Sequence, residues 1–216
     1  MPAADHGSVL GAFRDLRAPV SVHLPLAIAL AVLAWRQGPT PLLLLTAALS
    51  GFALWTLMEY WIHRAVLHMI PRGRVRRYLA GRHILHHRNP LGHPGVALLW
   101  VSLLVASTVF AALWLSFGRG LAAAIMVGIV TGYLSYEYTH LASHVGFAPL
   151  TPWGGWLRRH HSTHHEDSAR HNYAIVMPLW DWIFRTRWQP PPPRALSFPE
   201  PLRGDESDAT PRSDAA

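Results

Sequence analysis

Ten of the 15 histidines in this 216-residue sequence fall in four short groups whose spacing suits metal ligation. Two groups are pairs, HRAVLH and HLASH, and each pair is followed by a triplet of the form HxxHH. Residues three and four apart share one face of a helix, so we expect each triplet to present three imidazoles to one point. Neutral imidazole binds iron, copper, zinc and nickel, and the pattern therefore predicts a metal site without naming the metal. The predicted ligands are His63, His68, His83, His86, His87, His140, His144, His161, His164 and His165.

The first pair, His63 and His68, is spaced more loosely than the other groups. Five residues correspond to about 140° of rotation around an ideal α-helix. We therefore expect these two rings to reach different metal ions, unless the helix ends between them. Ten imidazoles, at about three to five for each ion, fit two divalent ions better than one.

Two acidic residues stand at helical spacing from predicted ligands. Glu59 precedes His63 by four residues, and Glu137 precedes His140 by three. A carboxylate in such a position can accept the outer N–H of a ligating imidazole and fix its tautomer. The alternative for Glu59 is an interfacial ion pair with Arg64. The remaining histidines are interpreted as ordinary polar residues (His6, His23, His93) or left unassigned beside the last triplet (His160, His171).

Four apolar stretches approach the roughly 20 residues that a helix needs to cross the hydrocarbon core of a membrane. Half of the chain is hydrophobic, and residues 98–115 carry no charge, which argues against a soluble helical bundle. We expect an all-α fold: an integral membrane bundle of about four transmembrane helices with a cytoplasmic, histidine-rich helical cap. The predicted spans are residues 20–35, 42–61, 96–117 and 121–138.

The arginines predict the orientation of this bundle. With four spans in the membrane domain 20–188, the N-terminal segment 1–19, the connection 64–95 and the C-terminal part share one side, which holds most of the arginines. The two hairpin turns on the opposite side hold only Arg36 and Arg119. By the positive-inside rule, the arginine-rich side is cytoplasmic.

The composition also excludes some classes of function. Because the chain has no cysteine, disulfides, thiolate metal sites and cysteine nucleophiles are ruled out. The net charge of +7 comes from arginines that flank apolar spans, without the aromatic and basic repeat of a nucleic-acid module. We therefore expect a bilayer surface, and no nucleic acid, as the anionic partner. The proline-rich tail, residues 189–216, is expected to be solvated and disordered.

Several stretches resemble the fatty acid hydroxylase and sterol desaturase superfamily, whose members are integral membrane enzymes with two non-haem metal ions. The order of the histidine boxes is most similar to the fatty acid hydroxylase branch. Ala174 and Arg185 depart from the family pattern, because members usually have glycine at these places. The likeness covers roughly 54–186 and rests on residues 54–64, 83–90, 136–144, 159–165 and 172–186.

The resemblance implies oxygen-dependent hydroxylation of a lipid acyl chain in lipid biosynthesis. It implies two iron ions as cofactors, with zinc able to occupy the site in purified protein, and dioxygen as co-substrate. An unactivated C–H bond has no acidic proton, so a redox metal supplies what side chains cannot. Asn172 and Asp181 would help to shape the cytoplasmic side of the site. Because residues 1–19 cannot hold the haem domain that many related hydroxylases carry, electrons would come from a separate donor protein.

Other functions are also compatible with the sequence. Within the superfamily, the reaction could be sterol or carotenoid oxidation, or desaturation. A histidine-rich membrane metal transporter is an alternative of a different class, but it would place its ligands along a path through the middle of the bilayer. An intramembrane zinc hydrolase is disfavoured because the sequence has no HExxH motif. No pattern in the sequence identifies the lipid.

Overall fold

The computed structural model describes residues 9–38, 40–68, 73–90, 99–145, 151–166 and 169–190. Within these ranges every regular element is helical, which confirms the predicted all-α class. Several predictions fall outside the described residues: the start of the third span (96–98), His6, His93 and the tail from 191 onward.

Four of the described helices are long and apolar enough to cross a membrane, so the chain is an integral membrane protein. They are α1 (Val9–Gln37), α2 (Pro41–Trp61), α4 (Leu99–Phe117) and α5 (Arg119–His144). The first is longer than the predicted span 20–35 because the helix continues through Pro19 and Pro25. Membrane helices tolerate such interior prolines because neighbouring groups satisfy the freed backbone atoms.

The breaks between these helices follow local sequence signals. Thr40 caps α2, its hydroxyl accepting a hydrogen bond from the Leu43 amide, and Pro41 occupies the first helical turn, where its missing N–H costs nothing. Gly118 separates α4 from α5 with a φ of +77°, a conformation that favours glycine. Both hairpins therefore turn where the sequence predicts.

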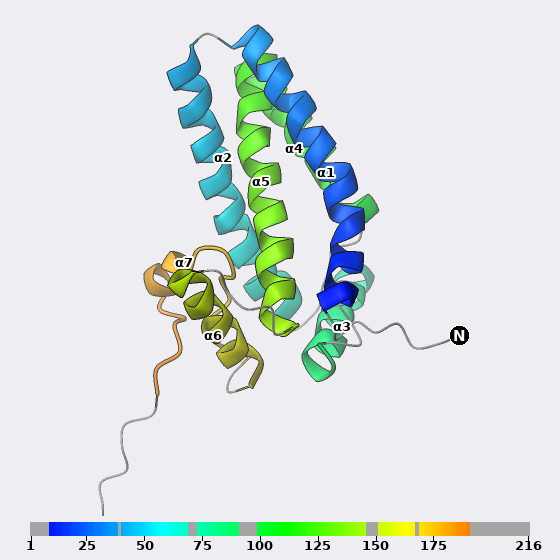
Figure 1. Ribbon diagram of the computed structural model, residues 1–216, viewed down its shortest axis with the longest axis vertical. Coiled ribbons are helices and arrows are strands. Elements are labelled where there is room, and N and C mark those ends of the chain that lie inside the picture. The colour runs from blue at the N-terminus through cyan, green and yellow to red at the C-terminus, as the bar shows by residue number, and fades with distance from the viewer. Residues whose placement is uncertain are drawn as a thin grey trace, which may run out of the picture.

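Helix α5 lies at the centre of the bundle, between α1 and α2, and α4 lies behind α5 and α1 in this view (Figure 1). Close approach depends on glycine at two places: a Cβ on Gly128 would collide with the Ala48 carbonyl, and a Cβ on Gly51 would collide with the Ile125 carbonyl. Such small residues allow membrane helices to pack backbone to backbone. By contrast, none of the residues of α4 is buried.

One end of the bundle carries the remaining helices (Figure 1). A seven-residue π-helix, η1 (Ile62–His68), continues α2 beyond Trp61. It is joined there by α3 (Arg74–Arg88), α6 (Pro152–Glu166) and the short α7 (Leu179–Ile183). All four elements and the end of α5 meet at this end, so the predicted histidine-rich helical cap is present.

Candidate metal centre

The ten predicted histidines converge at the capped end of the bundle in two groups of five. Within each group, one ring nitrogen from every histidine lies within 4.8 Å of the other four. We name the two sets the His63 group and the His86 group. The His63 group consists of His63, His68, His83, His87 and His164, and the His86 group consists of His86, His140, His144, His161 and His165.

The division between the groups cuts through both triplets, and the prediction that each triplet converges on one point is wrong. His83 and His87 belong to the His63 group, but His86, between them, belongs to the other. An α-helix turns by about 100° per residue, so positions i and i+4 stay close in direction while i+3 points away from i+4. The last triplet is divided in the opposite sense, with His164 alone in the His63 group.

The pair His63 and His68 also departs from the prediction, because both rings belong to the same group. Their Nε2 atoms are 3.1 Å apart. Residues 62–68 form a π-helix, whose i→i+5 hydrogen bonding brings residues five apart onto one face. The helix therefore neither ends between the two histidines nor sends them to different groups. A short π-helical stretch inside a longer helix is rare and frequently marks a functional site.

The spacing of the ring nitrogens fits metal coordination. Metal–nitrogen bonds of about 2.0–2.1 Å at right angles place neighbouring ligand atoms about 3 Å apart. In the His63 group the Nε2 atoms of His68 and His164 are 3.0 Å apart. In the His86 group the corresponding distances are 2.9 Å between His86 and His140 and 3.0 Å between His144 and His161.

Two backbone carbonyls fix the tautomers of ligands in the His63 group. His63 donates from Nδ1 to the Tyr173 carbonyl at 2.5 Å, and His164 donates from Nδ1 to the His171 carbonyl at 2.6 Å. A carbonyl can only accept, so each ring carries its proton on Nδ1 and turns the bare lone pair of Nε2 toward the group. Lone pairs facing one another repel, and a cation between them removes the repulsion.

Burial keeps the rings of the cap neutral. Loss of hydration lowers the pKa of His87 to about 3 and that of His164 to about 3, and neighbouring histidines contribute to the shift. The pKa values of His83, His161 and His165 are lowered by the same cause. Both ring nitrogens of His165 are buried without a hydrogen-bond partner among the described residues. Neutral, unpartnered nitrogens of this kind are what a metal ion requires, so both groups could bind metal.

Glu59 has different partners from those predicted. Its buried carboxylate accepts hydrogen bonds from the amides of Ile175 (2.5 Å) and Val176 (3.3 Å) rather than from His63. Nor does it pair with Arg64, which donates to the Tyr60 hydroxyl at 2.8 Å. Glu59 therefore holds the segment that follows Tyr173, and through that segment it supports the carbonyl that orients His63.

Asp181 organises the same closing segment, residues 172–186, from the other end. Its fully buried carboxylate accepts hydrogen bonds from the backbone amides of Tyr173 and Ala174, both at 2.9 Å, and from the Thr186 hydroxyl at 2.8 Å. It also accepts one from His160 Nε2 at 3.0 Å. His160, which the sequence left unassigned, is thus a structural residue whose ring faces the carboxylate and not the ligand groups.

Asn172 fastens the closing segment to α6. Its side-chain amide donates to the His160 carbonyl at 3.1 Å, and its side-chain oxygen accepts from the Trp188 amide at 2.8 Å. Glu137 is buried on α5 one turn before His140, and its predicted role behind that ligand stays a prediction. No sequence signal pointed to the carbonyls of Tyr173 and His171, because backbone acceptors leave no trace in side-chain patterns.

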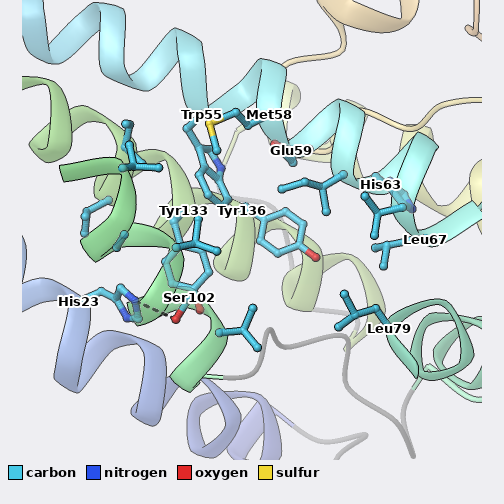
Figure 2. A pocket seen from close by; sticks show the side chains of 18 of the residues that line it. His23, Trp55, Met58, Glu59, His63, Leu67, Leu79, Ser102, Tyr133 and Tyr136 are labelled. Atoms are coloured by element: carbon cyan, nitrogen blue, oxygen red, sulfur yellow. Dashed lines mark hydrogen bonds between the residues drawn. The ribbon is translucent and has the colours of Figure 1, made fainter. Parts of the chain in front are cut away.

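A cavity of about 230 Å³ adjoins the His63 group and runs between the spans. Its walls come from α1, α2, α4, α5 and the cap, and they are mostly apolar. Glu59 and His63 lie at one side of the cavity, His23 and Ser102 lie at the opposite side, and Tyr133 and Tyr136 project between them (Figure 2). Arg82 and His83 of α3 also line it. The cavity therefore connects the histidines with the apolar interior of the bundle.

Comparisons with known proteins agree with this arrangement. The chain is 29% identical over 143 residues to the fatty acid 2-hydroxylase of Rattus norvegicus, across 63% of this chain and 38% of the rat protein. It is 31% identical over 142 residues to a dihydroceramide fatty acyl 2-hydroxylase of Arabidopsis thaliana, across 63% of this chain and 58% of that protein. The chain thus spans between about two fifths and three fifths of the length of these curated relatives.

A solved structure and a family model extend the comparison. The fold is similar to that of full-length Scs7p, of which only the hydroxylase domain is visible, with a TM-score of 0.72 and 21% sequence identity over 82% of this chain and 68% of that one. The model of the fatty acid hydroxylase family matches residues 48–186, which include all ten clustered histidines and the closing segment. The chain therefore belongs to the fatty acid hydroxylase family.

Proposed function

We propose that this protein hydroxylates the acyl chain of a membrane lipid, using dioxygen and two iron ions held by the His63 and His86 groups. The observation that carries the proposal is the position of the His63 group beside an apolar cavity between membrane spans. The saturated carbons of a fatty acyl chain are not electrophilic and their C–H bonds are too weakly acidic for side chains to ionise, so acid–base side chains alone would not insert oxygen there. Iron, when bound, supplies the redox chemistry that activates dioxygen.

The overall hydroxylation reaction requires electrons and protons in addition to dioxygen. One oxygen atom of dioxygen enters the C–H bond, and the other leaves as water after accepting two electrons and two protons. The electrons come, in this proposal, from a separate donor protein. Zinc would satisfy the same imidazoles but has no redox chemistry, so a zinc-filled site would be inactive.

The cavity suggests how the lipid lies. An acyl chain would extend along the apolar walls formed by Val101, Val105 and Ile129, while its polar end stays near Arg82, an exposed cation of α3 that lines the cavity beside His83. The names of the rat and Arabidopsis relatives, fatty acid 2-hydroxylase and dihydroceramide fatty acyl 2-hydroxylase, describe hydroxylation at carbon 2 of a fatty acyl chain. By analogy with them, we infer that the carbon next to the carboxyl group is the one that reacts here.

The same proposal covers the orientation of the protein in the membrane and the roles of the residues around the ligands. The membrane domain, residues 20–188, would carry the catalytic unit, with the histidine groups and both termini on the cytoplasmic side because the arginines lie there. Exposed arginines on α3, such as Arg74, Arg77 and Arg88, would face lipid phosphates or the electron donor. Glu59, Asn172 and Asp181 would position the carbonyls behind the ligands, and Glu137 would support His140.

Mass spectrometry of membrane lipids from cells with and without the protein tests this function. We expect one lipid class to gain an oxygen atom. The double variant His86→Ala/His164→Ala, which removes one ligand from each group, should abolish the gain. The variant His171→Ala is the matched control, because it removes an imidazole outside both groups and keeps the carbonyl that His164 uses.

Other outcomes of the same comparison would identify other functions. Loss of two hydrogen atoms from a lipid would make the protein a desaturase. A gain of oxygen on a sterol or carotenoid would move it to another branch of the superfamily. An unchanged lipid profile together with altered metal tolerance would contradict the oxygenase and favour a metal transporter.

A further inference from the structure

Three polar side chains from three different spans meet at the end of the cavity that lies away from the histidine groups. They are His23 of α1, Ser102 of α4 and Tyr133 of α5 (Figure 2). His23 is 2% exposed and Tyr133 is 4% exposed, so both are removed from lipid and water. Polar groups buried among membrane spans are costly and tend to mark function.

The hydrogen bonds of His23 define what it offers to the cavity. Its Nδ1 donates to the Pro19 carbonyl at 3.0 Å, because a carbonyl can only accept. Nε2 is therefore a hydrogen-bond acceptor, and Ser102 Oγ lies 3.2 Å from it. The same Ser102 hydroxyl also lies 2.8 Å from the Leu99 carbonyl. The Leu99 carbonyl and His23 Nε2 therefore compete for the single hydroxyl hydrogen of Ser102. When that hydrogen points to Leu99, His23 Nε2 can accept a hydrogen bond from another donor.

Tyr133 offers the complementary group. Its ring packs against His23 and Trp55, with centroid distances of 4.5 Å and 5.4 Å. Its hydroxyl is buried, and no described residue meets it with hydrogen-bonding geometry, although Ser102 and Glu137 are near. A buried hydroxyl without a partner is unusual in folded proteins and calls for an occupant. Here the hydroxyl belongs to a residue that lines the cavity, so the occupant would be a molecule in it.

The position of the cluster sets a distance from the ligands. Tyr133 precedes His140 by seven residues on α5, which corresponds to about 10 Å along the helix. His23 likewise lies seven residues inside the span that begins at Leu16, or about 10 Å into the membrane. The polar cluster is therefore about two helical turns further from the capped end of the bundle than His140.

We propose that His23, Ser102 and Tyr133 bind a hydroxyl group carried on the hydrocarbon chain of the lipid substrate, at about 10 Å from the reacting carbon. This inference rests on the proposed function, whose site it deepens. A hydroxyl would accept a hydrogen bond from Tyr133 and donate one to His23 Nε2, so both open positions would be filled. None of the three side chains carries a fixed charge, and the carboxylate near the Tyr133 hydroxyl is that of Glu137, so an anionic group placed here would lack a cation partner.

An extended hydrocarbon chain of about eight carbon–carbon bonds covers about 10 Å, given bond lengths of about 1.5 Å and angles near 111°. If carbon 2 reacts, the hydroxyl recognised by the cluster lies near carbon 10. The preferred substrate is therefore an acyl chain that already bears an oxygen in its middle part, and plain saturated chains are poorer ligands.

Binding to the iron-loaded, full-length protein in detergent under anaerobic conditions tests this proposal without relying on turnover. The ligands are hexadecanoic acid, 10-hydroxyhexadecanoic acid and 5-hydroxyhexadecanoic acid. We expect the 10-hydroxy acid to bind about tenfold more tightly than the plain acid, the order expected when buried polar groups gain their partners. The 5-hydroxy acid should show no such advantage, because its hydroxyl would lie against apolar walls.

Substitutions test whether the polar cluster causes the preference for the 10-hydroxy acid. Tyr133→Phe keeps the ring that packs on His23 and Trp55 but removes the hydroxyl, and it should reduce the tenfold preference to about one. Ser116→Ala is the matched control, because Ser116 is an exposed α4 serine that hydrogen-bonds only to its own helix at Ala112, and it should keep the preference. Equal binding of the three acids to the wild type, or a preference that survives Tyr133→Phe, would overturn the proposal and assign the cluster to a bound water or to helix packing. A preference with no lipid hydroxylation would leave this proposal standing and reject the proposed function.

Discussion

The rings of His87 and His165 stack face to face, with centroids 4.0 Å apart and planes inclined by 11°. His87 belongs to the His63 group and His165 to the His86 group, so the two sets of ligands touch along this stack. The two sites are therefore neighbours within one cluster of ten rings. Each nevertheless has its own five nitrogens, which makes the two sites separable by substitution.

Metal content should fall group by group. We expect His68→Ala and His144→Ala each to lower the metal content from about two ions per chain to about one, and the double variant to hold almost none. Elemental analysis of protein purified without oxygen measures this directly. The control His171→Ala should keep both ions. Full metal content in the double variant would contradict the assignment of the ligands.

The π-helix should depend on metal. Residues 62–68 have the π conformation that aligns His63 with His68, and such stretches are less stable than an α-helix. When a chelator removes the ion, we expect backbone amides of this stretch to exchange hydrogen about tenfold faster or more, while those in the middle of α2 are unchanged. Hydrogen exchange followed by mass spectrometry checks the difference. Equal exchange with and without metal would show that packing alone maintains the π-helix.

Asp181→Asn should destabilise the cap. The carboxylate accepts four hydrogen bonds, and an amide nitrogen placed among the N–H donors of Tyr173 and Ala174 would repel at least one of them. Loss of a buried bond to a charged group costs about 1.5–3 kcal/mol, so the thermal midpoint in detergent should fall by several degrees. Metal should also dissociate faster, because the Tyr173 carbonyl orients His63. Glu166→Gln changes an exposed carboxylate on α6 and should have no effect.

Ala174 and Arg185 stand where family members usually have glycine, and replacing each with glycine should change the stability of the protein in opposite directions. Arg185 has a φ of +56°, a left-handed conformation that favours glycine, whereas Ala174 is buried without a positive φ. We expect Arg185→Gly to raise the free energy of unfolding by up to about 1 kcal/mol and Ala174→Gly to lower it by about 0.5–1 kcal/mol. Thermal midpoints of the two variants in the same detergent give the comparison. A lower midpoint for Arg185→Gly would mean that the arginine side chain makes a stabilising contact.

Much of the fold and the choice of ligands could be predicted because the signals are local. A run such as 98–115 without a charge identifies a span, and histidines at intervals of three to five residues identify themselves as a set. The grouping of the ligands could not be predicted in the same way. Whether His86 turns toward His83 or toward His140 depends on how α3 docks against α5, which is a tertiary relationship.

The hydrogen-bond partners of Glu59 could not be predicted either, because they also depend on tertiary structure. Glu59 stands one turn before His63, yet it bonds to amides more than 110 residues further along the chain. The closing segment can reach it only because residues 172–186 fold back over the end of α2. Likewise, the π-helix of residues 62–68 has no reliable signature in residue types, since it arises where a site requires an extra residue in a turn.

The division of each triplet between the two groups has a thermodynamic consequence. Binding the first ion restrains α3 through His83 and His87 and restrains α6 through His164, and these same helices carry His86, His161 and His165 of the other site. The loss of conformational entropy needed to order the second site is therefore partly met when the first ion binds. When metal is limiting, we expect the two ions to load the wild-type chain with positive cooperativity, so that chains with one ion are fewer than two independent sites would give. In a variant that keeps only one intact group, an excess of metal still fills that group.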